Sequence, residues 1–187
     1  MQLTEQDFQG AANALNVPVA AIKAVTKVES NGGGFAANGR PKILFEAHKF
    51  HGFTKGRFHA SHPHLSQPTW ALGKQYYKLD QLARLDEAMT LDREAALKSA
   101  SYGLFQIMGF NFEACGFASV EDFYNAQCES EGAQLMAFVN FLKANGLDRH
   151  LRNKNWAAFA KGYNGPGYAA NHYDSKLATA YSSFGGK

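Results

Sequence analysis

The sequence has few cysteines and no long apolar run, and both absences narrow the kind of protein that it encodes. Two cysteines in 187 residues, Cys115 and Cys128, cannot build a disulfide scaffold, and their separation fits no zinc motif. We expect both to be small core residues, because free cysteine is among the most buried residue types. No stretch approaches the roughly 18 apolar residues that span a bilayer, so stable membrane insertion is not expected.

A basic, apolar leader is also missing from the start of the chain. Residues 1–7 are polar and acidic, so we expect no secretory signal peptide. Lysine and arginine form no dense run, so nucleic acid is not an expected partner. The length suits one hydrophobic core and is short for two, which predicts a single domain over residues 1–187. We expect that domain to be a monomer.

The small net charge of +3 is unevenly placed. From residue 141 to the end, seven Lys and Arg residues stand against two acids, a local charge of +5. A solvated helical surface is the simplest interpretation of this bias. The alternative is attraction to anionic polymers of the bacterial envelope.

Helical patterns account for most of the chain and predict a mainly α fold. Thr4 and Asp7 form a capping box, and Pro18 suits the first turn of a second helix. After residue 33 we expect a small irregular or β part, with a short strand at 42–46 and a long loop at 51–70. The expected helices cover 4–15, 18–29, 74–89, 92–100, 119–128, 130–145, 156–162 and 169–183.

Glu29 stands at the end of an apolar helical stripe and is followed by Gly32, Gly33 and Gly34. Cleavage of a glycosidic bond needs an acid that stays protonated near neutral pH, whereas a solvated glutamate titrates near about 4.3. Desolvation by Ile22 and Val25, and the negative carbonyl end of the helix, would both raise the pKa of Glu29. The alternative is an ordinary surface glutamate.

Two later segments accompany Glu29-Ser30: SYGLFQIMG at 101–109 and GYNGPG at 162–167. Together they resemble the lysozyme-like superfamily, especially goose-type lysozymes and lytic transglycosylases, although Gly165 directly after Asn164 departs slightly from that pattern. The longer pattern, with GRPKILFEAH at 39–48 and WAAFAKGYNGPG at 156–167, resembles the N-acetylmuramidase domain of phage and prophage endolysins. The resemblance runs from about residue 4 to residue 182.

This resemblance implies a lysozyme-like helical fold that needs no cofactor and cleaves the N-acetylmuramic acid–N-acetylglucosamine bond of peptidoglycan, with Glu29 as general acid. It implies that Ser101 and Gln106 contact the sugar. Tyr163 would bring its hydroxyl to the acid or the scissile sugar, and Asn164 would bind an acetamido group or orient backbone. A core aromatic with a bonded hydroxyl is the alternative for Tyr163.

Glu46 is the nearest acid after Glu29 in the sequence and lies in a motif of the resembled family. A retaining enzyme needs a second carboxylate at about 5 Å from the acid, and an inverting enzyme needs a base at about 6.5–9.5 Å. Glu46 could serve as a ligand of the substrate or form a structural salt bridge. If no second acid faces the cleft, an acetamido or 6-hydroxyl group of the substrate could attack instead. The latter reaction is that of a lytic transglycosylase.

Five histidines between residues 48 and 64 raise the question of a metal. No cysteine is near them and no His-Glu-x-x-His pattern exists, so we expect no metal site and place them on or near the sugar cleft. A wall-binding module without catalysis, or membrane attack by the basic C-terminal helices, are the alternatives from other functional classes. The resemblance further implies a protein made in the host cytoplasm and released to the wall by a hole-forming partner.

Overall fold

The computed structural model describes residues 2–30 and 32–187, and most of them are helical. The helices are α1 (Glu5–Leu15), α2 (Val19–Glu29), α3 (Ala47–Phe53), α4 (Trp70–Gly73), α5 (Gln81–Leu91), α6 (Arg93–Lys98), α7 (Val120–Glu129), α8 (Glu131–Ala144), α9 (Asp148–Arg152), α10 (Trp156–Asn164) and α11 (Tyr173–Ser183). The strands are β1 (Ile43–Phe45), β2 (Ala100–Tyr102) and β3 (Ile107–Met108), and short 3-10 helices are η1 (Lys74–Lys78), η2 (Gly109–Asn111) and η3 (Pro166–Asn171). The predicted fold class, mainly α with a small β part after α2, is confirmed.

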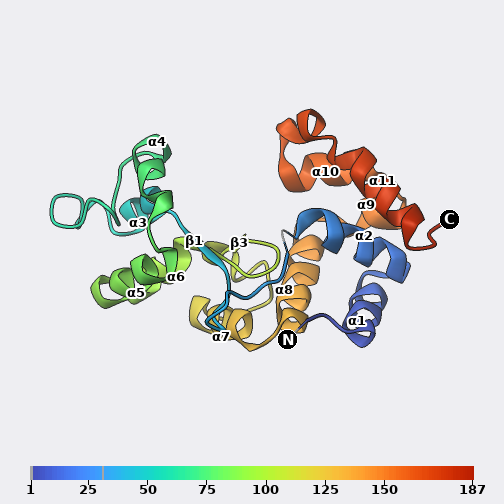
Figure 1. Cartoon of the computed structure of the whole chain (residues 1–187), viewed down its shortest axis with the longest axis horizontal. Coiled ribbons are helices and arrows are strands. Elements are labelled where there is room, and N and C mark those ends of the chain that lie inside the picture. Colours follow the sequence, from blue (N-terminus) through green and yellow to red (C-terminus); the bar gives the residue numbers. More distant parts are fainter. Residues whose placement is uncertain (1, 31) are drawn as a thin grey trace.

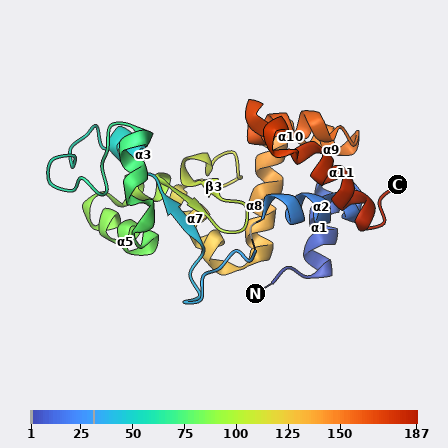
Figure 2. The same cartoon turned by 45° about the horizontal axis from the view of Figure 1, so that its top comes forward.

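The elements gather at two ends of an elongated molecule, with the sheet between them (Figure 1). Helices α3 to α6 form one end, and α1, α2 and α9 to α11 form the other. Helix α11 packs along α2, and α10 packs on α11, so the chain's last helices cover the second one (Figure 2).

The sheet is antiparallel with the order β1-β2-β3. Ile43 faces Tyr102 across the first pair, and Ser101 faces Met108 across the second. The tight turn between β2 and β3 places Gly103 at φ 68° and Gln106 at φ 50°, in the left-handed region. The segment 101–109 is therefore a hairpin. The sequence did not predict it, because its strands are too short to show alternation of apolar and polar residues.

One hydrophobic cluster runs from Ala11 in α1 to Leu177 in α11 and joins both ends of the molecule. Its largest fully buried aromatic side chains are Phe45, Phe50, Tyr102, Phe123 and Phe159. The one hydroxyl in this set is satisfied, because Tyr102 donates a hydrogen bond to the carbonyl of Leu97 at 2.9 Å.

Side-chain caps fix most of the predicted helix starts. The capping box of Thr4 and Asp7 is present, and Ser119, Ser130 and Asn155 each accept a hydrogen bond from a backbone N–H of the helix that follows. These caps satisfy donors that helix geometry leaves free, so their local sequence signals were dependable.

Three predicted element boundaries are wrong. The expected helix at 74–89 is broken, since Leu79 is extended and Asp80 caps a new helix, α5, by accepting from the N–H groups of residues 82 and 83. The last helix begins at Tyr173 rather than 169, because His172 adopts a left-handed conformation. The expected loop at 51–70 is shorter, because α3 extends to Phe53.

The two cysteines differ from each other. Cys115 is buried as expected, and burial raises the pKa of its thiol to about 12. Cys128 is exposed, so the prediction of a core residue was wrong there. Within residues 2–30 and 32–187, no helix combines the length and the apolar character that a bilayer crossing requires.

Candidate active site

Glu29 is the last residue of α2, so the expected position at the carbonyl end of a helix is confirmed. Its side chain is partly buried, and this burial raises the pKa of the carboxyl above its ordinary value. Asn164, at the end of α10, donates a hydrogen bond from Nδ2 to Oε1 of Glu29 at 3.0 Å. That bond favours the anion and lowers the pKa, but burial is the larger effect.

Tyr163 lies between the core and Glu29. Its ring stacks on Phe159 and meets the edge of Phe138, and its hydroxyl donates to the carbonyl of Phe105 at 3.2 Å. Burial raises the pKa of Tyr163, and the charge of Glu29 raises it further. Tyr163 is therefore a core aromatic with a bonded hydroxyl, and a direct role for that hydroxyl at the acid or the sugar stays a prediction.

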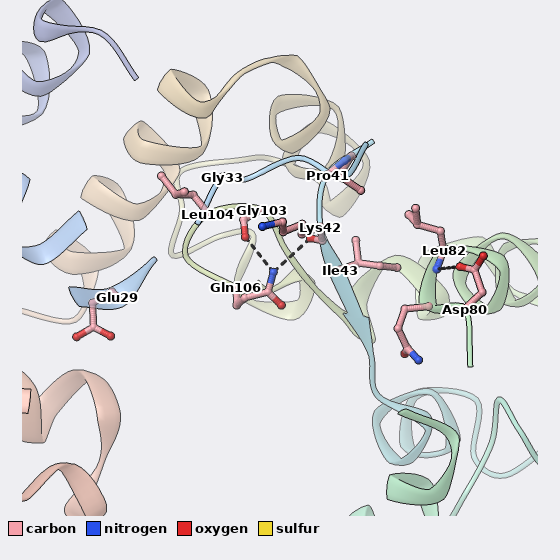
Figure 3. Close-up of a pocket in the computed structure, with 12 residues that line it drawn as sticks. Glu29, Gly33, Pro41, Lys42, Ile43, Asp80, Leu82, Gly103, Leu104 and Gln106 are labelled. Carbon is pink, nitrogen blue, oxygen red and sulfur yellow. Dashed lines mark hydrogen bonds between the residues drawn. The ribbon is translucent and has the colours of Figure 1, made fainter. Parts of the chain in front are cut away.

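Gln106 ties the hairpin to β1. Its Nε2 donates to the carbonyls of Gly103 at 2.9 Å and Lys42 at 3.3 Å, as Figure 3 shows. Its Oε1 accepts from the hydroxyl of Ser101 at 2.9 Å. Ser101 is only 5% exposed, so it lies behind Gln106 and positions that amide.

Two hollows meet at Glu29 and Gln106, which line both of them. The first has a volume of about 490 Å³ and extends past Lys42 and Ile43 to Asp80; Glu29 and Asp80 lie at its opposite ends (Figure 3). The second has a volume of about 380 Å³ and is lined by Tyr163 and Asn164, among others. Each volume suits a small-molecule site, and a chain that crosses from one hollow to the other must pass Glu29.

Comparisons with known proteins identify the family and the fold. A profile of N-acetylmuramidases matches residues 18–185. The chain belongs to the N-acetylmuramidase family. It is similar to the crystal structure of a Burkholderia AP3 phage endolysin, with 40% sequence identity, a TM-score of 0.90, and coverage of 98% of this chain and 72% of that one. The comparison with curated proteins gave no match. The chain is therefore a peptidoglycan-cleaving enzyme.

Glu46 does not line either hollow of this muramidase. It precedes α3 and accepts a hydrogen bond from the hydroxyl of Tyr77 at 2.6 Å, and its carboxylate lies 3.2 Å from Nδ1 of His48. The pKa of Tyr77 is raised to about 12, first by burial and then by this bond to Glu46. The contacts of Glu46 are those of a structural residue, and its role as a ligand of the substrate stays a prediction.

Two buried polar side chains of α8 hold the two loops that flank the groove formed by the two hollows. Oε1 of Glu131, in the first turn of α8, accepts from the backbone N–H of Gly34 at 2.6 Å. One turn later, Oε1 of Gln134 accepts from the N–H of Leu104 at 2.8 Å. A side chain at Gly34 would collide with Gln134, which explains a glycine at this position. Helix α8 thus fixes the segment after Glu29 and the hairpin together.

Several residues of the groove were not predicted from the sequence. Asp80 was hidden within the single helix expected at 74–89, although its position before a helical pattern is a typical cap signal. Asn111 and Tyr173 line the second hollow and had no motif to mark them. None of the five clustered histidines lines either hollow, and their expected position on or near the sugar cleft stays a prediction. Within the described residues, no three metal-ligating side chains are grouped to hold an ion.

Proposed function

We propose that this muramidase cleaves the N-acetylmuramic acid–N-acetylglucosamine bond of peptidoglycan with Glu29 as general acid. The observation that carries the proposal is the position of Glu29, partly buried and with a raised pKa, where the two hollows meet. A glycan strand that occupies both hollows presents a glycosidic oxygen to this carboxyl. The protonated form delivers its proton to the leaving oxygen, and positive charge develops on the sugar that remains.

The other groove residues support this reaction by holding geometry. Asn164 fixes one oxygen of Glu29, which leaves the other oxygen to carry the transferable proton. Gln106 and Ser101 hold the hairpin against β1, so the wall of the groove opposite Glu29 keeps its shape. Rigid placement of the acid matters because proton transfer needs hydrogen-bond distance to the glycosidic oxygen.

Replacement of Glu29 by glutamine tests the proposal. The variant keeps the shape of the side chain and loses the proton, so release of reducing ends from purified peptidoglycan should fall by about 10²–10⁴-fold. Glu129→Gln is a matched control, since Glu129 is the last residue of α7 and is exposed. Thermal melts of both variants should match that of the parent or exceed it. Full activity of the Glu29→Gln protein would reject Glu29 as the acid.

A lytic transglycosylase is the second candidate, and the carboxylates of the groove favour keeping it. Among the described residues that line the two hollows, Asp80 is the carboxylate besides Glu29, and it lies at the far end of the first hollow. A 6-hydroxyl group of the substrate could therefore attack in place of water. Mass spectrometry of the digest separates the two, since hydrolysis leaves reducing muramic acid ends and the alternative leaves 1,6-anhydro ends.

The similarity to a phage endolysin extends the proposal to the biological setting. We infer that the protein accumulates in the host cytoplasm and reaches the wall after the inner membrane is opened. Expression in the cytoplasm should leave cells intact until a membrane-permeabilising agent is added, and a catalytically dead Glu29→Gln protein should leave them intact afterwards. Lysis without permeabilisation would contradict this inference.

A further inference from the structure

A third hollow of about 490 Å³ lies between α2 and α11, and we call it the α2–α11 groove. Helix α11 lies along α2 in both views of the molecule (Figure 1 and Figure 2). The groove combines cationic, hydroxyl and apolar side chains. Its lining includes Lys27, Val28, Tyr173, Lys176, Thr179 and Ala180.

The α2–α11 groove adjoins the catalytic groove. Tyr173 lines both the α2–α11 groove and the second hollow beside Glu29. Lys27 and Val28 directly precede Glu29 in α2. A ligand that extends from the second hollow across Tyr173 therefore enters the α2–α11 groove without leaving the surface of the enzyme.

Two lysines give the α2–α11 groove its positive charge. Lys27 and Lys176 are exposed, and each ammonium lies 5.5 Å from an aromatic ring centroid, that of Phe184 and that of Tyr173 respectively. Neither of them forms an ion pair with any described residue, in contrast to Lys23, which pairs with Glu5 at 2.6 Å. Among the described lining residues there is no carboxylate, so both charges are available to an anionic ligand.

We propose that the α2–α11 groove binds the stem peptide of the muramic acid residue in the second hollow, through the carboxylates of that peptide. This inference rests on the proposed function, because it needs a glycan strand across Glu29. A stem of four or five residues reaches at most about 13–18 Å from its sugar, enough to extend past one side chain such as Tyr173. Its carboxylates match Lys27 and Lys176, and its alanine methyl groups match Val28 and Ala180.

The experiment compares two substrates and several variants. Cleavage rates are measured on glycan strands that carry their stem peptides and on the same strands stripped by an amidase. The readout is kcat/KM on the strands that carry stem peptides divided by kcat/KM on the stripped strands. The double variant Lys27→Gln/Lys176→Gln should lower this ratio by about fivefold at low salt, as expected for two exposed ion pairs, and less at high salt. Lys161→Gln, an exposed lysine on α10 outside the groove, should leave it unchanged.

A second measurement needs no variant. When the stem carboxylates of the peptide-bearing strands are converted to amides, the ratio for the parent enzyme should fall to the value expected for the double variant. An unchanged ratio in either measurement overturns the stem-peptide site. The site is also overturned if a phosphate-rich wall polymer inhibits cleavage of stripped strands as strongly as it inhibits cleavage of strands that carry stem peptides. If the parent enzyme cleaves neither substrate, the proposed function itself fails. Cleavage of stripped strands with an unchanged ratio overturns the stem-peptide site alone.

Discussion

Replacing Asn164 by alanine should move the pH dependence of catalysis in a direction that the structure fixes. Asn164 donates the hydrogen bond that favours the anionic form of Glu29, against the effect of burial. Without that bond the pKa of Glu29 rises further above its ordinary value. Because the general acid acts in its protonated form, activity is lost as pH rises through this pKa. The alkaline limb of the profile should therefore move to higher pH.

The size of the movement follows from the bond and its surroundings. A hydrogen bond to a charged group contributes about 1.5–3 kcal/mol when it is well shielded. Glu29 is only partly buried, so water replaces part of the lost bond, and about 1 kcal/mol is a reasonable net figure. Loss of the bond adds to the effect of burial, so the pKa of Glu29 and with it the alkaline limb should move upward.

The assay is the pH profile of kcat/KM for release of reducing ends from soluble glycan strands, since this quantity reports the free enzyme. The position of the limb is the readout, because Asn164 could also contribute to the height of the profile by contacting the sugar. Asn111→Ala is the control, since Asn111 lines the same hollow without a hydrogen bond to Glu29. A limb that stays in place or moves to lower pH would refute the assignment of Glu29 as the acid that Asn164 tunes.

Three further predictions concern stability, each measured by urea unfolding. Glu29→Gln should be more stable than the parent at pH 7, because ionising a buried carboxyl with a raised pKa lowers the free energy of unfolding. The difference should vanish by about pH 4, near the pKa of glutamate in the unfolded chain. Gly34→Ala should lose about 1–3 kcal/mol through collision with a buried amide, whereas Gly10→Ala, at an exposed position of α1, should gain about 0.5–1 kcal/mol. Arg84→Met should lose about 1–3 kcal/mol or more, since its buried guanidinium satisfies several carbonyls, while exposed Arg57→Met should lose no more than about 1 kcal/mol.

Local signals in the sequence were enough to predict most of the helices and the position of Glu29 at the end of one of them. A cap such as Ser119 or Ser130 needs only the three residues that follow it, so its signal is complete in the sequence. Glu29 was marked by an apolar stripe before it and glycines after it, and the structure places it at the end of α2 as that pattern predicted. Both kinds of inference depend on neighbours within one or two helical turns.

The parts that were missed depend on contacts between distant residues. Glu131 bonds to a backbone N–H that is 97 positions earlier in the chain, and nothing in its helix distinguishes it from a surface glutamate. The strands of the 101–109 hairpin are too short to show alternation. They pair with each other, and β2 also pairs with β1, which lies more than 50 residues earlier in the chain. Asp80 was overlooked because a repeat of leucines every three residues suggested one continuous helix through it.

The search for a second catalytic carboxylate shows why distance along the chain is a poor guide to a site. Glu46 is the next acid after Glu29 in sequence, yet its side chain is only 14% exposed, and its carboxylate contacts Tyr77 and His48 instead of either hollow. Asp80 lines the first hollow, but one of its oxygens caps α5 and its position is at the end remote from Glu29. If neither acid activates the nucleophile, water or a substrate group must attack without a protein carboxylate as base. Glu46→Gln should then lower the free energy of unfolding and leave kcat of the folded protein nearly unchanged. A loss of kcat comparable to that of Glu29→Gln in a fully folded protein would overturn this reasoning.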